Sequence, residues 1–142
     1  MAENLDLALL LAVFGAERGQ RIEGRMRIQK LVCLLQYADG IPFSFSFKPY
    51  YYGPFSDDLS ESINSLVGMR LIRETVTPTL YRSYRYDYEL TGEGRRLLGR
   101  MEAQNGELTG RISRLVRGYD DYSTPTLVRM AKEISGIPSI RG

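Results

Sequence analysis

Hydrophobic positions in the first half of the chain recur every three or four residues, which is the spacing of amphipathic helices. Three helices are predicted there, over residues 4–18, 24–37 and 56–67. The third begins at Ser56, a good N-cap residue, and its first turn carries acids that the helix dipole favours. The first helix is apolar on nearly every side, so it must be covered either within the domain or by a second subunit.

Alternating aromatic and polar residues predict strands around the third helix. Phenylalanines at every second position of residues 43–47 predict a half-buried strand, which a Gly53-Pro54 break follows. Residues 71–76 and 81–90 predict two further strands, joined by a polar loop that begins at Thr77. Together the last two strands predict an antiparallel hairpin.

The second half of the chain returns to helical spacing. Thr91 is the predicted N-cap of a fourth helix, which residues 105–106 (Asn-Gly) interrupt. An apolar stripe predicts a further helix from residue 108 to about residue 118. Thr124 is predicted to cap a short last helix that ends at Gly136.

The order of these elements is the outline of a winged helix, a scaffold that usually binds DNA and sometimes binds protein. We therefore predict an α+β fold, a winged helix-turn-helix with extra C-terminal helices. Residues 1–142 form a single domain in this prediction, with a winged-helix core over 1–104 and a helical extension over 105–142. A chain of this length can bury a core without help from a metal or a disulfide.

The composition limits the kinds of catalytic and metal-binding site that the chain can contain. The chain has no histidine and one cysteine, which removes histidine bases and the common zinc sites. That cysteine, Cys33, lies in an apolar run and is predicted to be a buried, inert thiol. We predict no catalytic residue, no cofactor, no metal and no enzyme activity. The apolar run at residues 7–14 is too short to cross a membrane, and a cytoplasmic location is expected.

Three short blocks carry a family resemblance. They are residues 27–32 (RIQKLV), 52–56 (YGPFS) and 88–91 (YELT), in this order. Together they resemble the YwgA-like and SocA-like (Panacea) winged-helix family, over roughly residues 5–122. The resemblance implies a winged-helix fold, and its SocA-like members are antitoxins or adaptors that bind proteins. It transfers no catalytic residue.

Two basic groups lead to our first hypothesis, a DNA-binding transcriptional regulator that contacts double-stranded DNA. The first group surrounds the second helix and begins at Arg18 and Arg21; the second lies in the hairpin loop, where arginine beside tyrosine suits phosphate contact and stacking. The candidate nucleic-acid-binding residues are Arg25, Arg27, Lys30, Tyr81, Arg82 and Arg85.

Both basic groups also have interpretations that involve no DNA. A solvated helix face is the simpler interpretation of the first group. An ordinary exposed hairpin tip explains the second group equally well. The stem of Lys30 could instead cover the aromatic strand while its head stays in water. The net charge of +2 permits DNA binding without requiring it.

The third helix favours a different partner. In a winged helix it is the expected recognition helix, yet its outward residues are largely acidic, and phosphates would repel them. The candidate protein-binding residues are Asp57, Asp58, Glu61 and Asn64. They support the alternative hypothesis, a protein-interaction module such as an antitoxin or a proteolytic adaptor. The apolar first helix and the C-terminal segment also make a homodimer an expectation.

Two further surface groups have simpler explanations. Arg111, Arg114 and Arg117 recur every three residues, so they share one helical face, which is more simply a solvated face than a binding ridge. The aromatic residues between 43 and 55 could stack bases, but core packing explains the phenylalanines more simply.

Overall fold

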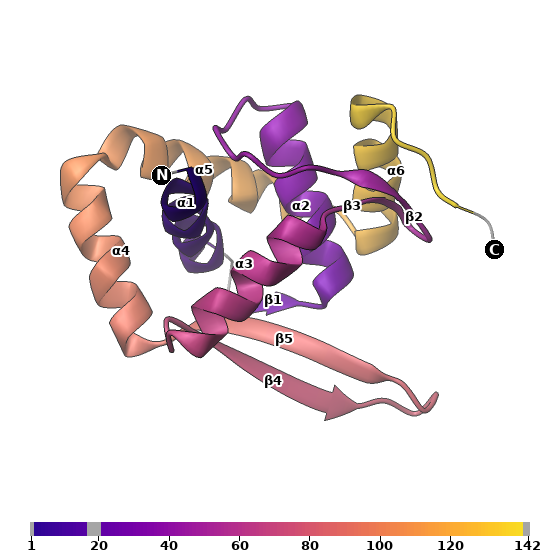
Figure 1. Cartoon of the computed structure of the whole chain (residues 1–142), viewed down its shortest axis with the longest axis horizontal. Helices are drawn as coiled ribbons and strands as arrows, with labels where there is room; N and C mark the ends of the chain where they lie inside the picture. The colour runs from indigo at the N-terminus through magenta and orange to yellow at the C-terminus, as the bar shows by residue number, and fades with distance from the viewer. Residues whose placement is uncertain (1, 17–20, 141–142) are drawn as a thin grey trace.

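The structure, a computed structural model, describes residues 2–16 and 21–140. This part of the chain forms six helices and five short strands, so the predicted α+β class is confirmed (Figure 1). The elements are α1 (Ala2–Ala16), β1 (Arg21–Glu23), α2 (Arg25–Tyr37), β2 (Lys48–Tyr50), β3 (Gly53–Phe55), α3 (Asp57–Gly68), β4 (Ile72–Pro78), β5 (Tyr84–Leu90), α4 (Gly92–Gln104), α5 (Gly106–Tyr119) and α6 (Thr124–Ser135).

Helix α1 lies at the centre of the core. Its side chains from Leu9 to Phe14 are all buried, although they point in every direction around the helix. Helices α3, α4 and α5 and strand β5 pack around it (Figure 1). The apolar surface of α1 is thus covered within one chain, so it does not itself require a second subunit. The homodimer stays a prediction.

Three antiparallel strands form the main sheet in the order β1-β5-β4. The predicted hairpin is confirmed as β4 and β5, with Ile72 opposite Leu90. The first strand, β1, was not predicted, because it has three residues and a single apolar one, Ile22. Ile22 lies opposite Tyr88, whose buried ring packs against Phe14 of α1. This contact anchors the sheet to the core.

The strand predicted over residues 43–47 is wrong. Phe43 and Phe45 are buried, whereas Ser44 and Ser46 are exposed, so the alternation is real, but no described strand pairs with this segment. The side-chain amide of Gln36 takes the place of a partner strand, donating to the carbonyl of Phe45 at 2.9 Å and accepting from its N–H at 3.2 Å. A small hairpin forms instead from β2 and β3, directly after this segment.

The predicted N-caps at Ser56 and Thr91 are confirmed, since each side chain accepts a hydrogen bond from a backbone N–H of the first turn. The cap predicted at Thr124 is wrong by one residue. The hydroxyl of Ser123 accepts from the N–H of Thr126 at 3.3 Å, so the helix begins one position earlier. Gly136 ends the helix, as predicted, and the structure shows it in the left-handed conformation.

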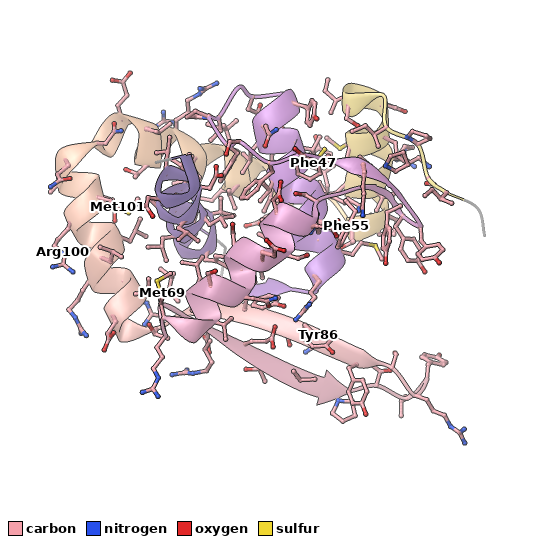
Figure 2. The ribbon with its side chains drawn as sticks, viewed as in Figure 1. Phe47, Phe55, Met69, Tyr86, Arg100 and Met101 are labelled. Carbon is pink, nitrogen blue, oxygen red and sulfur yellow. The ribbon has the colours of Figure 1, made fainter. Side chains whose placement is uncertain are left out.

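The C-terminal helices are part of the same body. Ile112 and Val116 of α5 are buried in the cluster that contains α1. Leu127 of α6 is buried in a smaller cluster with Cys33 and Leu34 of α2. Figure 2 shows Met101 of α4 directed toward α1, whereas Arg100 points away from the body. Within residues 2–16 and 21–140, no helix is long and apolar enough to span a membrane.

Gly94 provides a test of how α4 joins the sheet. A Cβ atom there would overlap the backbone carbonyl oxygen of Leu71, which cannot move without displacing β4. We expect Gly94→Ala to lower the free energy of unfolding by about 1–3 kcal/mol. Gly99→Ala in the same helix meets no atom within 4 Å and should raise it by about 0.5–1 kcal/mol. Urea unfolding of both variants checks this pair, and equal effects would contradict it.

Candidate functional site

Two side chains of α2 hold the segment that leads into α3. The amide of Gln29 donates to the carbonyl of Ser56 at 3.0 Å and accepts from its N–H at 2.9 Å. The ammonium of Lys30 donates to the carbonyl of Pro54 at 2.8 Å. Residues 27–32 and 52–56, which carry the family resemblance, therefore contact each other. We call this pair of contacts the α2 latch.

Lys30 is not available to a ligand. Its side chain is only 2% exposed, and burial lowers the pKa of its ammonium group to about 8. The expectation that its head group stays in water is wrong, because the head group is held under the Pro54 carbonyl. Nearby, burial raises the pKa of the Cys33 thiol to about 11, and this buried cysteine matches the prediction.

The other predicted cations of α2 also have partners within the chain. Arg27 donates to the carbonyls of Tyr122 at 2.9 Å and Tyr119 at 3.2 Å, which ties α2 to the end of α5. Arg25 pairs with Glu74 at 2.9 Å and lies 4.5 Å from the ring centre of Tyr86. These contacts give both arginines structural roles, and Glu74 offsets the charge of Arg25.

The positions of the side chains of Arg18 and Arg21, the first two arginines of this basic group, are not described. Arg18 lies outside the described residues. The side chain of Arg21 also falls outside the part of the chain that the structure describes. Among the described residues, Arg25, Arg27 and Lys30 therefore do not form the basic surface that was predicted around α2.

The residues predicted in the hairpin loop are at the surface. Tyr81 is 90% exposed at the tip, and Arg82 and Arg85 are also exposed. Arg85 pairs with the buried carboxylate of Asp87 at 3.1 Å, which takes up part of its charge. The sequence reasoning missed Leu80, which is 96% exposed beside Tyr81. An apolar residue inside a polar loop was the available signal.

An open groove runs between the start of α1, the segment before β2 and one face of α3, and its volume is about 420 Å³. The predicted acids Asp58 and Glu61 are among its lining residues. The groove is lined by Asp6, Leu7, Ser44, Phe45, Asp58, Glu61, Ser62 and Ser65. We call it the acidic groove. Carboxylates, hydroxyls and two apolar side chains therefore share one concave surface.

Negative charge in the acidic groove has no counter-charge from the described residues. Asp6 is only 4% exposed, and its carboxylate accepts hydrogen bonds from the N–H and the hydroxyl of Ser44. In the part of the chain that the structure describes, no lysine or arginine forms an ion pair with Asp6, Asp58 or Glu61. Low-dielectric walls concentrate the field of such carboxylates. The groove is thus suited to a cation.

Of the four residues that were predicted to bind a protein, two lie in the acidic groove and two lie outside it. Asp58 and Glu61 line the acidic groove, whereas Asp57 and Asn64 do not. Asp57 instead pairs with Lys48 at 2.7 Å. Sequence reasoning missed Asp6 as a groove residue. The signal available for it was an acid directly beside the long apolar run of α1.

The arginine ridge on α5 is partly structural. Arg111 donates to the backbone carbonyl of Asp39, just beyond the end of α2. The hydroxyl of Tyr119 donates to the carboxylate of Asp39 at 2.7 Å, so the pKa of this tyrosine is raised by burial and by the carboxylate. Both contacts fix α5 against α2. Arg111 therefore has a structural contact that neither interpretation of this face predicted, and the solvated face stays a prediction for Arg114 and Arg117.

Comparisons with known proteins add no assignment. No model of a known protein family matches the chain, and no curated protein sequence matches it. Over residues 2–16 and 21–140, no three cysteine, aspartate or glutamate side chains come together to hold a metal ion. The case for a function therefore depends on the geometry of the surfaces described above.

The buried Lys30 makes stability depend on pH. Its pKa is about 8 in the folded chain against 10.5 in the unfolded chain, so between these values the unfolded state binds more protons. Stability must then rise with pH across this window, by up to about 3 kcal/mol in total. Lys30→Met removes this contribution. We expect the stability of the wild type relative to Lys30→Met to increase by about 1 kcal/mol per pH unit above pH 8.

Urea unfolding of both proteins between pH 7 and pH 10 measures this difference. Ionisation of Cys33 opposes the rise at higher pH, since its folded pKa is raised. Cys33 is present in both proteins, so its contributions differ only by the effect of the Lys30 charge, which lowers the Cys33 pKa. Parallel stability profiles for the two proteins would show that the Lys30 ammonium keeps its ordinary pKa.

Proposed function

We propose that this chain is a winged-helix protein-interaction module whose acidic groove binds a basic segment of a partner protein. The observation that supports this most is the concave surface of Asp6, Asp58 and Glu61, which no described cation neutralises. Antitoxins and proteolytic adaptors are examples of proteins that act through such a module.

The order of elements supports the winged-helix part of the proposal. Helix α1, strand β1, helices α2 and α3, and the hairpin of β4 and β5 follow one another, with the two small strands β2 and β3 inserted before α3. Strand β1 pairs with β5, which closes a three-stranded sheet beside the helices. In this arrangement α3 is the helix that a winged-helix protein presents to its ligand.

The charge on α3 favours protein over DNA at this helix. Asp58 and Glu61 would face the phosphates of a duplex, and among the described residues no lysine or arginine forms an ion pair with either of them. The predicted DNA-binding residues Arg27 and Lys30 support the fold rather than a surface. A continuous positive surface that joins α2 to the hairpin is therefore not supported by the described residues.

The chemistry of the acidic groove specifies the partner's side chain. A lysine or arginine stem can pack on Leu7 and Phe45 while its head group reaches the carboxylates of Asp58 and Glu61. Serine hydroxyls along the groove supply further acceptors. The buried charge of Asp6 adds attraction without needing to move. We infer that the partner presents one or more basic side chains flanked by apolar residues.

Affinity capture from extracts of the source cells tests this proposal. The full chain is used as bait in three forms: wild type, the double variant Asp58→Asn/Glu61→Gln, and Asp57→Asn. We expect the wild type to capture a protein in stoichiometric amount and the double variant to bind that protein at least about tenfold more weakly. Isothermal titration with the purified partner measures the difference.

Asp57→Asn is the matched control. It removes a carboxylate from the same helical turn, but Asp57 faces Lys48 and does not line the groove. This variant should keep nearly full affinity. Equal losses in the two variants would reject the acidic groove as the binding surface, and capture of no stoichiometric protein would reject the function.

A further inference from the structure

The turn of the β4–β5 hairpin closes on itself. The N–H of Thr79 donates to the carbonyl of Ser83 at 2.9 Å, and the hydroxyls of these two residues lie 2.7 Å apart. The N–H of Tyr81 donates to the Thr79 hydroxyl at 3.3 Å. These bonds hold the turn in one shape, so a contact made by the turn would not have to order it first.

Three residues at the end of this turn, Leu80, Tyr81 and Arg82, combine apolar surface with a positive charge, and we call them the hairpin tip. Leu80 is 96% exposed and Tyr81 is 90% exposed. Arg82 is exposed and forms no ion pair with a residue that the structure describes. The charge of the tip is that of Arg82 alone, because Arg85 pairs with Asp87 at 3.1 Å. Adjacent large apolar side chains in solvent are typical of a contact surface.

The acidic groove has the complementary composition. Asp58 and Glu61 supply carboxylates that have no cationic partner among the described residues, and Leu7 and Phe45 supply apolar walls. We inferred that the groove takes a basic side chain flanked by apolar residues. The hairpin tip is such a segment, and it belongs to the same chain.

The tip cannot reach the groove of its own molecule. The two strands are paired from Ile72 and Leu90 out to Pro78 and Tyr84, so the hairpin is stiff up to its turn. It projects from one side of the molecule, whereas the segment before β2, which forms a wall of the groove, lies on the other (Figure 1). A contact between tip and groove therefore requires two molecules.

We propose that the hairpin tip of one copy binds in the acidic groove of a second copy. Arg82 donates to the carboxylates of Asp58 and Glu61, while Leu80 and Tyr81 pack on the apolar walls. A guanidinium group suits this position because its planar fork of donors can bridge the oxygens of a carboxylate. The inference rests on the proposed preference of the groove for basic side chains, and it names one ligand for the groove, a second copy of this chain.

Such a contact would regulate the groove. The tip has three residues, so the contact is smaller than a standard protein interface and is expected to be weak. One groove cannot hold a tip and a partner protein at the same time. Self-association therefore reduces the fraction of free grooves as the protein concentration rises, and partner binding becomes sensitive to that concentration.

The two contact surfaces differ, so the association is heterologous. A molecule that is engaged through its tip still has a free groove, and the wild type can add further copies or close into a ring. A variant with a defective tip and a variant with a defective groove can each make only one of the two contacts. A mixture of these two variants therefore isolates a single contact between one tip and one groove.

Sedimentation velocity of the full chain tests the proposal. Arg82→Gly removes the charge of the tip and suits the left-handed backbone at this position, where φ is 58°. Asp58→Asn/Glu61→Gln removes the charge of the groove with little change in side-chain size. We expect the wild type to associate as its concentration rises, and each variant alone to associate at least about tenfold more weakly. An equimolar mixture of the two variants should form a one-to-one pair, because it restores one intact tip and one intact groove.

Asp57→Asn and Arg100→Ala are the matched controls. Asp57 pairs with Lys48 outside the groove, and Arg100 points away from the body on α4 (Figure 2). Each control removes one charge of the same sign as a tested residue, and both should associate as the wild type does. Raising the salt concentration from about 50 mM to about 500 mM should weaken the association of the wild type, because mobile ions screen the charges. Leu80→Ala should also weaken the association but leave this salt dependence unchanged.

Three results would overturn the proposal. They are a wild type that stays monomeric up to about 1 mM, a mixture of the two variants that does not pair, and equal association of Arg82→Gly and Arg100→Ala. Capture with Arg82→Gly as bait separates this failure from that of the proposed function, since this variant keeps the acidic groove. A captured partner without pairing of the mixture rejects only the self-association. Pairing of the mixture without a captured protein rejects only the partner protein.

Discussion

The α2 latch is the constraint on which the rest of the arrangement depends. Gln29 satisfies both backbone groups of Ser56, and Ser56 in turn caps α3 through its side chain. Lys30 fixes the carbonyl two residues earlier. Because these groups are buried, each lost hydrogen bond would leave a desolvated polar atom without a partner. The latch therefore sets where α3 begins and how it lies against α2, and thereby the position of one wall of the acidic groove.

The residues that carry the family resemblance consequently serve the fold. Gln29 and Lys30 hold Pro54 and Ser56, and Thr91 caps α4 while its hydroxyl contacts the backbone that precedes β4. The two surfaces that we propose to bind ligands use other residues. A shared framework of this kind can present different surfaces, so the framework alone does not specify what the protein binds.

Local signals predicted the local structure well. Ser56 and Thr91 correctly predicted the starts of two helices, because a helix cap depends only on residues within one turn. Prediction failed where the local structure depends on residues that are distant in the sequence. The side chain of Gln36 replaces a strand beside Phe45, and Ile22 forms a strand only because β5 lies next to it. Spacing along the chain contains no information about such partners.

The candidate sites show the same limit. Asp58 and Glu61 could be recognised as outward acids on one helix, but Asp6 joins them from far along the chain. Arginine and lysine on α2 had the spacing of a surface patch, and only the packed structure shows that Arg27 reaches α5 and that Lys30 lies inside. Patterns identify which residues face outward from one element. They do not show which faces a neighbouring element covers.

The environment of Cys33 has a practical consequence. This thiol is the sole cysteine of the chain, is completely buried between α2 and α6, and ionises only well above neutral pH. A thiol-specific reagent can modify it only after those two helices separate. The rate of labelling therefore reports how often the α2–α6 contact opens, without any engineered probe, and it does so independently of events at the hairpin tip or in the acidic groove.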